Sequence, residues 1–77
     1  MAKSKAHRLE KLIKRETEAI EKCNKLWADH ADKDTRLIHP DYCREYVHMR
    51  VGISARAKLI LDLGGSLEGL PMIVTVQ

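Results

Sequence analysis

Apolar side chains recur every three to four positions over residues 4–32, a stretch that contains neither proline nor glycine. Residues seven positions apart lie on the same side of a helix, and we call each such series a column. Three adjacent columns contain most of these side chains: Leu9, Glu16, Cys23 and His30; Leu12, Ala19 and Leu26; Ile13, Ile20 and Trp27. This spacing is typical of one face of an α-helix, here interrupted by one glutamate. The pattern predicts a first helix over about residues 4–32, roughly 40 Å long, whose apolar stripe needs an equally long partner.

A second helix is predicted over about residues 40–63, after a polar turn at 33–39. Pro40 suits the first turn of a helix, and Asp41 interacts favourably with the helix dipole there. Gly64 and Gly65 are typical of a helix C-terminus. The apolar positions between these ends again form columns: Tyr42, Met49, Arg56 and Leu63; Tyr46, Ile53 and Ile60.

The second helix is apolar around too much of its circumference for one neighbour. Leu59, Ile60 and Leu61 are consecutive, so they cannot all face the first helix. We therefore expect a second contact face, for another subunit. The predicted fold class is all-α: an antiparallel helical hairpin with an extended C-terminal tail (residues 64–77), which we expect to assemble as a dimeric four-helix bundle.

The tail ends in MIVTV (residues 72–76), which has strong β propensity. A single strand is not stable alone, and an exposed one promotes aggregation. We expect residues 72–76 to be extended and to pack on the helices or pair across the dimer. The alternative is that they pair with a sheet edge of another protein.

Length and composition favour a small, self-associating domain. A chain of 77 residues forms one domain with a marginal core, and two cysteines allow at most one disulfide. Oligomerisation is the remaining source of stability. No apolar stretch suits a signal peptide or a membrane span, so we expect a cytoplasmic protein without membrane association.

Positive charge is concentrated in the first predicted helix. The chain carries a net charge of +3, and residues 1–25 contain eight Lys or Arg against four Glu. Arg8, Arg15 and Lys22 fall in one column, and Lys11 and Lys25 fall in the next. A cationic edge of this kind could follow nucleic-acid phosphates. Alternatively, pairs four residues apart such as Glu18–Lys22 could make ordinary surface ion pairs.

Metal and enzyme chemistry have little support. Cys23, His30, His39 and Cys43 could approach one another near the turn, but their spacing matches no standard zinc pattern. The stretch DHADKD (residues 29–34) places carboxylates beside a histidine, yet the sequence offers no nucleophile with an orienting partner and no phosphate-binding glycine loop. We expect no metal, no cofactor and no enzymatic activity.

The preferred function is a small protein-interaction module, an adaptor or inhibitor of the kind common among accessory proteins of phages and mobile elements. The alternative is a nucleic-acid-binding dimer that uses Arg8, Lys11, Arg15, Lys22 and Lys25. A third hypothesis is a small-molecule or nucleotide site at a subunit junction, with ligands from His30, Tyr46, His48 and Arg50. The candidate protein-binding or dimer residues are Trp27, Tyr42, Tyr46, Met49, Ile53, Ile60, Leu63, Met72, Ile73 and Val74.

Overall fold

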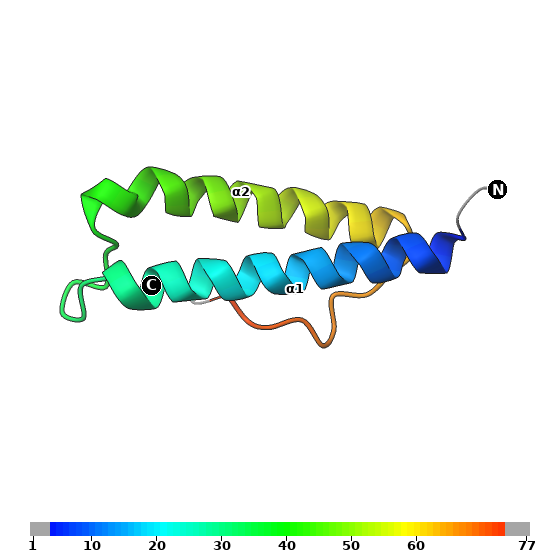
Figure 1. The fold of residues 1–77 in the computed structure, drawn as a ribbon, viewed down its shortest axis with the longest axis horizontal. Helices are drawn as coiled ribbons and strands as arrows, with labels where there is room; N and C mark the ends of the chain where they lie inside the picture. The colour runs from blue at the N-terminus through cyan, green and yellow to red at the C-terminus, as the bar shows by residue number, and fades with distance from the viewer. Residues whose placement is uncertain (1–3, 74–77) are drawn as a thin grey trace.

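The computed structural model describes residues 4–73. Two helices, α1 (Lys5–His30) and α2 (Pro40–Asp62), run antiparallel and pack against each other (Figure 1). Within the described residues there is no strand, only an isolated bridge between Ala31 and Ile38. The prediction of an all-helical fold with two packed helices is therefore confirmed.

The connection between the helices is a closed turn held by hydrogen bonds. The Asp32 carboxylate accepts from the backbone N–H groups of Asp34 (2.7 Å) and Thr35 (3.0 Å). The N–H of Asp32 donates to the Leu37 carbonyl at 2.8 Å, which draws the two sides of the turn together. His39 then caps α2, because its Nδ1 accepts from the N–H of Asp41. The chain thus reverses direction within nine residues, 31–39.

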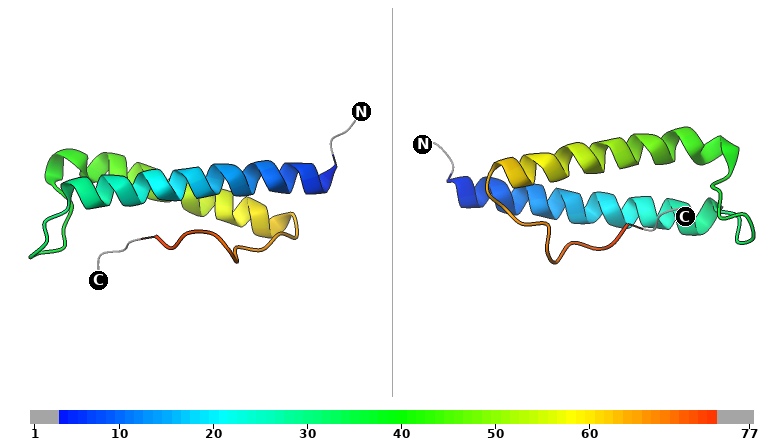
Figure 2. Two further views of the ribbon diagram at one scale, coloured as in Figure 1. Left: turned by 60° about the horizontal axis from the view of Figure 1, so that its bottom comes forward. Right: turned by 180° about the vertical axis from the view of Figure 1, so that it is seen from behind.

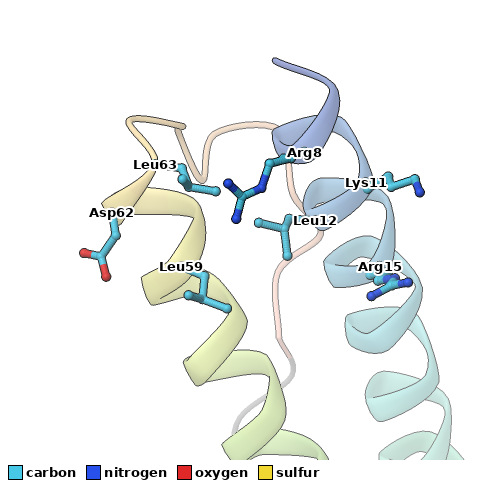
Figure 3. Close-up of a pocket in the computed structure, with 7 residues that line it drawn as sticks. All are labelled: Arg8, Lys11, Leu12, Arg15, Leu59, Asp62 and Leu63. Carbon is cyan, nitrogen blue, oxygen red and sulfur yellow. The ribbon is translucent and has the colours of Figure 1, made fainter. Parts of the chain in front are cut away.

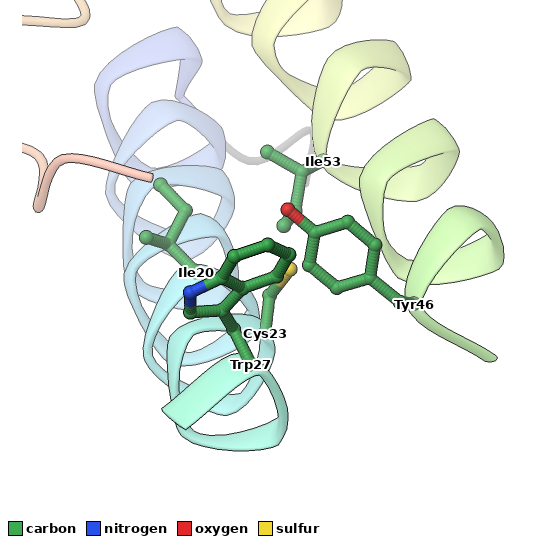
Figure 4. Packing of buried hydrophobic residues seen from close by; sticks show 5 residues of the cluster. All are labelled: Ile20, Cys23, Trp27, Tyr46 and Ile53. Carbon is green, nitrogen blue, oxygen red and sulfur yellow. The ribbon is translucent and has the colours of Figure 1, made fainter. Parts of the chain in front are cut away.

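The core lies between the two helices near this turn. Ile20, Cys23 and Trp27 from α1 meet Tyr46 and Ile53 from α2 (Figure 4). The Trp27 and Tyr46 rings lie 5.5 Å apart at an angle of 46°, within the range of favourable aromatic pairs. The predicted apolar columns of both helices therefore face each other.

A buried ion pair continues the core toward the other end. Glu16, which interrupts the α1 stripe, is only 1% exposed, and its Oε1 accepts a hydrogen bond from Arg56 Nη1 at 3.1 Å. Its Oε2 is buried and has no hydrogen-bond partner. Ile60 lies beyond the pair and is fully buried. The charged residues in the two apolar columns thus match each other across the helix interface.

Two glycines end α2 and turn the chain back. Gly64 has a φ of +83°, a left-handed conformation that side chains rarely adopt. Gly65 donates its N–H to the Ile60 carbonyl at 2.8 Å, and a Cβ at this position would lie 2.8 Å from a Leu9 methyl group. The close approach of this segment to α1 therefore requires glycine.

The C-terminal segment, residues 65–73, runs beside one face of the helix pair (Figure 2). Leu70 and Ile73 pack against the core, and Asn24 donates to the Met72 carbonyl at 2.8 Å. The Met72 side chain is 88% exposed. Of the predicted strand at 72–76, residues 74–76 lie outside the described part. The segment covers one face of the helix pair; we call the opposite face the open face.

The first prediction concerns the buried ion pair. Arg56→Met should lower the free energy of unfolding by about 2–4 kcal/mol, because it leaves the Glu16 carboxylate buried without its counter-charge. The double variant with Glu16→Met should recover most of this loss. Urea denaturation followed by circular dichroism measures both. Arg44→Met, at an exposed position of α2, is the matched control, and an equal effect of both single variants would contradict the prediction.

The second prediction concerns the C-terminal segment. Leu70→Ser should destabilise the protein by about 1–2 kcal/mol, since Leu70 packs on the core. Met72→Ser should have almost no effect, because that side chain is already in solvent. A chain ending at Gly65 should melt at a lower temperature than the full chain. Equal melting temperatures for all of these proteins would show that the segment is not structural.

Candidate functional site

Large apolar side chains remain in solvent after the core has formed. Those on the helices that are half or more exposed are Val47, Val51, Leu59 and Leu61, all from α2. They divide between two surfaces. Leu59 borders a groove on the open face, and the other three belong to the side of α2 that points away from α1.

The groove begins near the start of α1. Leu12 from α1 and Leu59 and Leu63 from α2 point into the space between the helices (Figure 3). They form the apolar lining of a pocket of about 370 Å³. In the same view the C-terminal segment passes behind the helices, on the far side from these side chains. This end of the groove is therefore open to a partner.

The groove continues toward the middle of the helices in a second pocket of about 220 Å³. Ala19 and Lys22 line it from α1, one heptad beyond Leu12 and Arg15. Met49, Gly52 and the neighbouring His48 and Arg56 line it from α2. A Cβ added at Gly52 would meet nothing within 4 Å, so the missing side chain deepens the groove. We call the two pockets together the open groove.

The rim of the open groove is strongly basic. Arg8, Lys11 and Arg15 line the first pocket, and Lys22 lines the second. The structure gives the side chains of Arg8, Arg15 and Lys22 no ion pair or hydrogen bond within residues 4–73, and Glu18 is not within ion-pair distance of Lys22. Asp62 is the one acidic lining residue, and its carboxylate points away from α1 (Figure 3). The Arg8, Arg15 and Lys22 side chains are therefore not neutralised by a neighbour within the described residues.

The second surface is the outer face of α2, made of Val47, Val51, Ala55 and Leu61. The first three are spaced four residues apart and so lie along one side of the helix. Val47, Val51 and Leu61 are between 52% and 62% exposed. An apolar strip of this kind on a surface helix is typical of a protein contact.

The turn forms a third, more polar site. His30 and Tyr42 stack with ring centroids 3.5 Å apart, and they line a cavity of about 540 Å³ together with the turn. Hydrogen bonds from the N–H groups of Thr35 and Asp34 hold the pKa of Asp32 below its ordinary value. These bonds are already satisfied within the turn, so they explain its shape without a ligand.

The four candidate metal ligands are not brought together. Cys23 is buried in the core, whereas Cys43 is exposed on α2. His30 stacks on Tyr42, and His39 caps α2 through its Nδ1. Among residues 4–73 no group of three or more His, Cys, Asp or Glu side chains is arranged to hold a metal ion.

The candidate protein-binding residues fall in several environments. Trp27, Tyr46, Ile53 and Ile60 are buried between the helices, so the chain itself already covers them. Met49 and Leu63 line the open groove, Ile73 packs on the core and Met72 is exposed. Val74 lies outside the described residues. Of the candidate basic residues, Arg8, Lys11, Arg15 and Lys22 line the groove, whereas Lys25 does not.

Sequence reasoning missed the Glu16–Arg56 pair and the groove residues Leu12 and Leu59. The pair left a signal, because one apolar column of each helix contains a single charged residue, and the two are of opposite sign. Leu12 was assigned to the helix interface on its column, and only the three-dimensional structure shows it at the edge of that interface. No sequence pattern separates an interface edge from its centre.

The third prediction uses the two cysteines. Burial raises the pKa of the Cys23 thiol, and Arg50 opposes this only partly. The neutral Cys23 thiol therefore stabilises the fold at pH values below the ordinary thiol pKa. This contribution to the free energy of unfolding is lost as the pH rises through the higher pKa of the folded state. At pH 8 and low micromolar protein, Cys43 should react with a thiol reagent much faster than Cys23. Mass spectrometry of digested protein measures both sites; equal rates would contradict the burial of Cys23.

Comparison with protein-family models, curated proteins and solved structures finds no match to this chain. Neither helix of the described structure has the length and apolar character needed to cross a membrane. The function must therefore be argued from the surfaces themselves.

Proposed function

We propose that this chain is a non-enzymatic protein-interaction module. In this proposal it is a helical hairpin that pairs with a second copy through the outer face of α2 and binds another protein through the open groove. The observation that carries it is the exposure of large apolar residues on two separate surfaces, Val47, Val51 and Leu61 on the outer face of α2 and Leu59 at the open groove, after the chain has buried only a small core. Such surfaces are typical of protein contacts.

The shape of the chain supports a need for a partner. Its Cα extents are 51 × 21 × 17 Å, so the fold is long and thin. It exposes 6046 Å². A compact monomer of its mass would expose about 4,800 Å². The difference exceeds the roughly 800 Å² that each partner buries in a standard protein interface.

Charge assigns the two surfaces to different occupants. A second copy placed on the open groove would bring its own Arg8, Arg15 and Lys22 close to those of the first. Like charges facing each other in a contact are unfavourable. The outer face of α2 carries Val47, Val51, Ala55 and Leu61, and its exposed charged residues, Arg44, Lys58 and Asp62, are of both signs. Self-association is therefore favoured on α2, and a foreign partner in the groove.

Nucleic-acid binding is the second candidate, favoured by the basic row Arg8, Arg15 and Lys22 on one edge of α1. Two features weigh against it. The groove beside this row is lined by leucines, which gain nothing from phosphates. The aromatic residues that could stack on bases are also committed elsewhere: Trp27 and Tyr46 are buried in the core, and Tyr42 stacks on His30.

The small-molecule hypothesis has less support, because its four residues do not line one pocket. Arg50 donates to the Tyr46 hydroxyl at 2.9 Å, within the helix pair. His30 lines the cavity at the turn, and His48 lines the open groove.

The fourth prediction tests self-association. At about 100 µM, light scattering after size exclusion should give a dimer, twice the 8.8 kDa chain mass. Val47→Asp combined with Val51→Asp should yield the monomer, because charge on this face would have to be buried without a partner. Both positions are exposed within one chain, so circular dichroism should still show a folded protein.

Leu37→Asp is the matched control for this experiment. Leu37 is 59% exposed, but it lies in the turn and not on α2. The control should therefore remain dimeric. A wild-type mass that stays at 8.8 kDa across the concentration range would refute the assembly.

A further inference from the structure

We propose that the open groove binds an amphipathic α-helix of a partner protein, one whose apolar stripe is flanked by acidic residues. This inference rests on the proposed function, because it names the chemistry of the partner in the groove. Three properties of the groove carry it: its apolar floor, the side chains of Arg8, Arg15 and Lys22 on its rim, which are unpaired within the described residues, and its length between two helices.

The floor sets the apolar stripe of the partner. Leu12, Leu59 and Leu63 form one cluster, and Met49 and Ala19 continue it toward the middle of the helix pair. Side chains spaced three, four and seven residues apart on a bound helix would fall on this line of positions. The gap at Gly52 can receive the largest of them, since nothing occupies the space a side chain would take there.

The rim sets the charge of the partner. Arg8, Arg15 and Lys22 follow one edge of α1 at intervals of seven residues, and they make no ion pair within the described residues. Carboxylates on the flank of a bound helix, spaced seven residues or about two turns apart, would face this edge. The apolar floor would exclude water beside these pairs, which strengthens them relative to fully exposed pairs.

The length of the groove favours a helix as the bound element. Arg8 and Lys22 are fourteen residues apart in α1, which corresponds to about 21 Å. A helix of about fourteen residues spans this distance and would form a three-helix layer with α1 and α2. An extended strand would need an unpaired sheet edge, and residues 4–73 contain no strand to supply one.

The experiment uses two designed fourteen-residue peptides with a fluorescent label. Both carry leucines at helical spacing; one has glutamates beside the stripe and the other has lysines at the same positions. In fluorescence anisotropy at low salt the acidic peptide should bind with a micromolar dissociation constant, and the basic peptide at least tenfold more weakly. Higher salt should weaken the binding of the acidic peptide without abolishing it, because the contacts of the leucines are not screened by salt.

Two variants locate the binding in the groove. Gly52→Leu fills the groove from α2 without a clash within the chain, and it replaces glycine by a better helix former. This variant should remain folded, and it should weaken the binding of the acidic peptide about tenfold or more. The double variant Arg8→Glu with Arg15→Glu should weaken the binding of the acidic peptide and strengthen the binding of the basic peptide. Unfolding cannot produce such a reversal of preference.

Lys14→Glu with Lys25→Glu is the matched control, since it changes net charge equally at exposed positions of α1 that line neither pocket. It should retain at least half of the affinity for the acidic peptide. If this control loses as much affinity as Arg8→Glu with Arg15→Glu, or if Gly52→Leu has no effect, the groove is not the site. Equal binding of both peptides would refute the charge assignment.

A twenty-nucleotide single-stranded DNA serves as the competing ligand. It should bind more weakly than the acidic peptide at physiological salt, and Gly52→Leu should not change its binding. If DNA binds more tightly and the acidic peptide does not bind, the basic rim serves nucleic acid and the inference is refuted. The dimer measured by light scattering is independent of these results, so the loss of peptide binding alone leaves self-association standing.

Discussion

The hydrogen-bonded ion pair between Glu16 and Arg56 fixes how the two helices of this protein lie against each other. Apolar contacts between helices tolerate sliding, because one leucine replaces another at little cost. A buried carboxylate does not tolerate sliding, because moving it away from its counter-charge leaves the carboxylate uncompensated in an environment without water. The pair joins residues forty positions apart, and it therefore selects one register out of several that the apolar columns alone would accept.

That register decides which residues reach the surface. With Glu16 opposite Arg56, the core residues Ile20, Cys23 and Trp27 meet Tyr46 and Ile53 near the turn. Leu12 and Leu59 are then left at the edge of the interface, where they line a groove and do not close it. A sliding of the helices by one turn would redistribute these side chains, and the groove would lose its lining.

The sequence predicted the helices well because their signals are local. The helical spacing of apolar residues, Pro40 at the start of α2 and the glycines after it define the elements within two residues of the observed ends. The core residues Ile20, Trp27 and Ile53 also follow from the columns. The arrangement of the C-terminal segment did not follow, because it depends on a hydrogen bond from Asn24 and on the close contact of Gly65 with Leu9, both between residues distant in sequence.

The candidate surfaces were harder to predict for a related reason. A column of apolar residues shows that a helix has a buried side, but it does not show where the covered area stops. Trp27 and Tyr46 looked like possible binding residues and are covered by the chain itself. Leu59 was assigned to an apolar face in general, and its place at the groove depends on the angle between the two helices and on the route of the C-terminal segment.

That route also explains why the chain offers two kinds of surface and not one. The C-terminal segment packs Leu70 and Ile73 against one face of the helix pair, so the chain itself covers part of that face. The open face keeps an apolar floor but carries arginines and a lysine along its rim, which oppose a second copy and favour an acidic partner. The outer face of α2 exposes Val47, Val51 and Leu61 with charges of both signs around them, and in the proposed function it meets its own copy. In the proposed function, a thin two-helix protein separates assembly from recognition, since each contact uses a surface that the other leaves free.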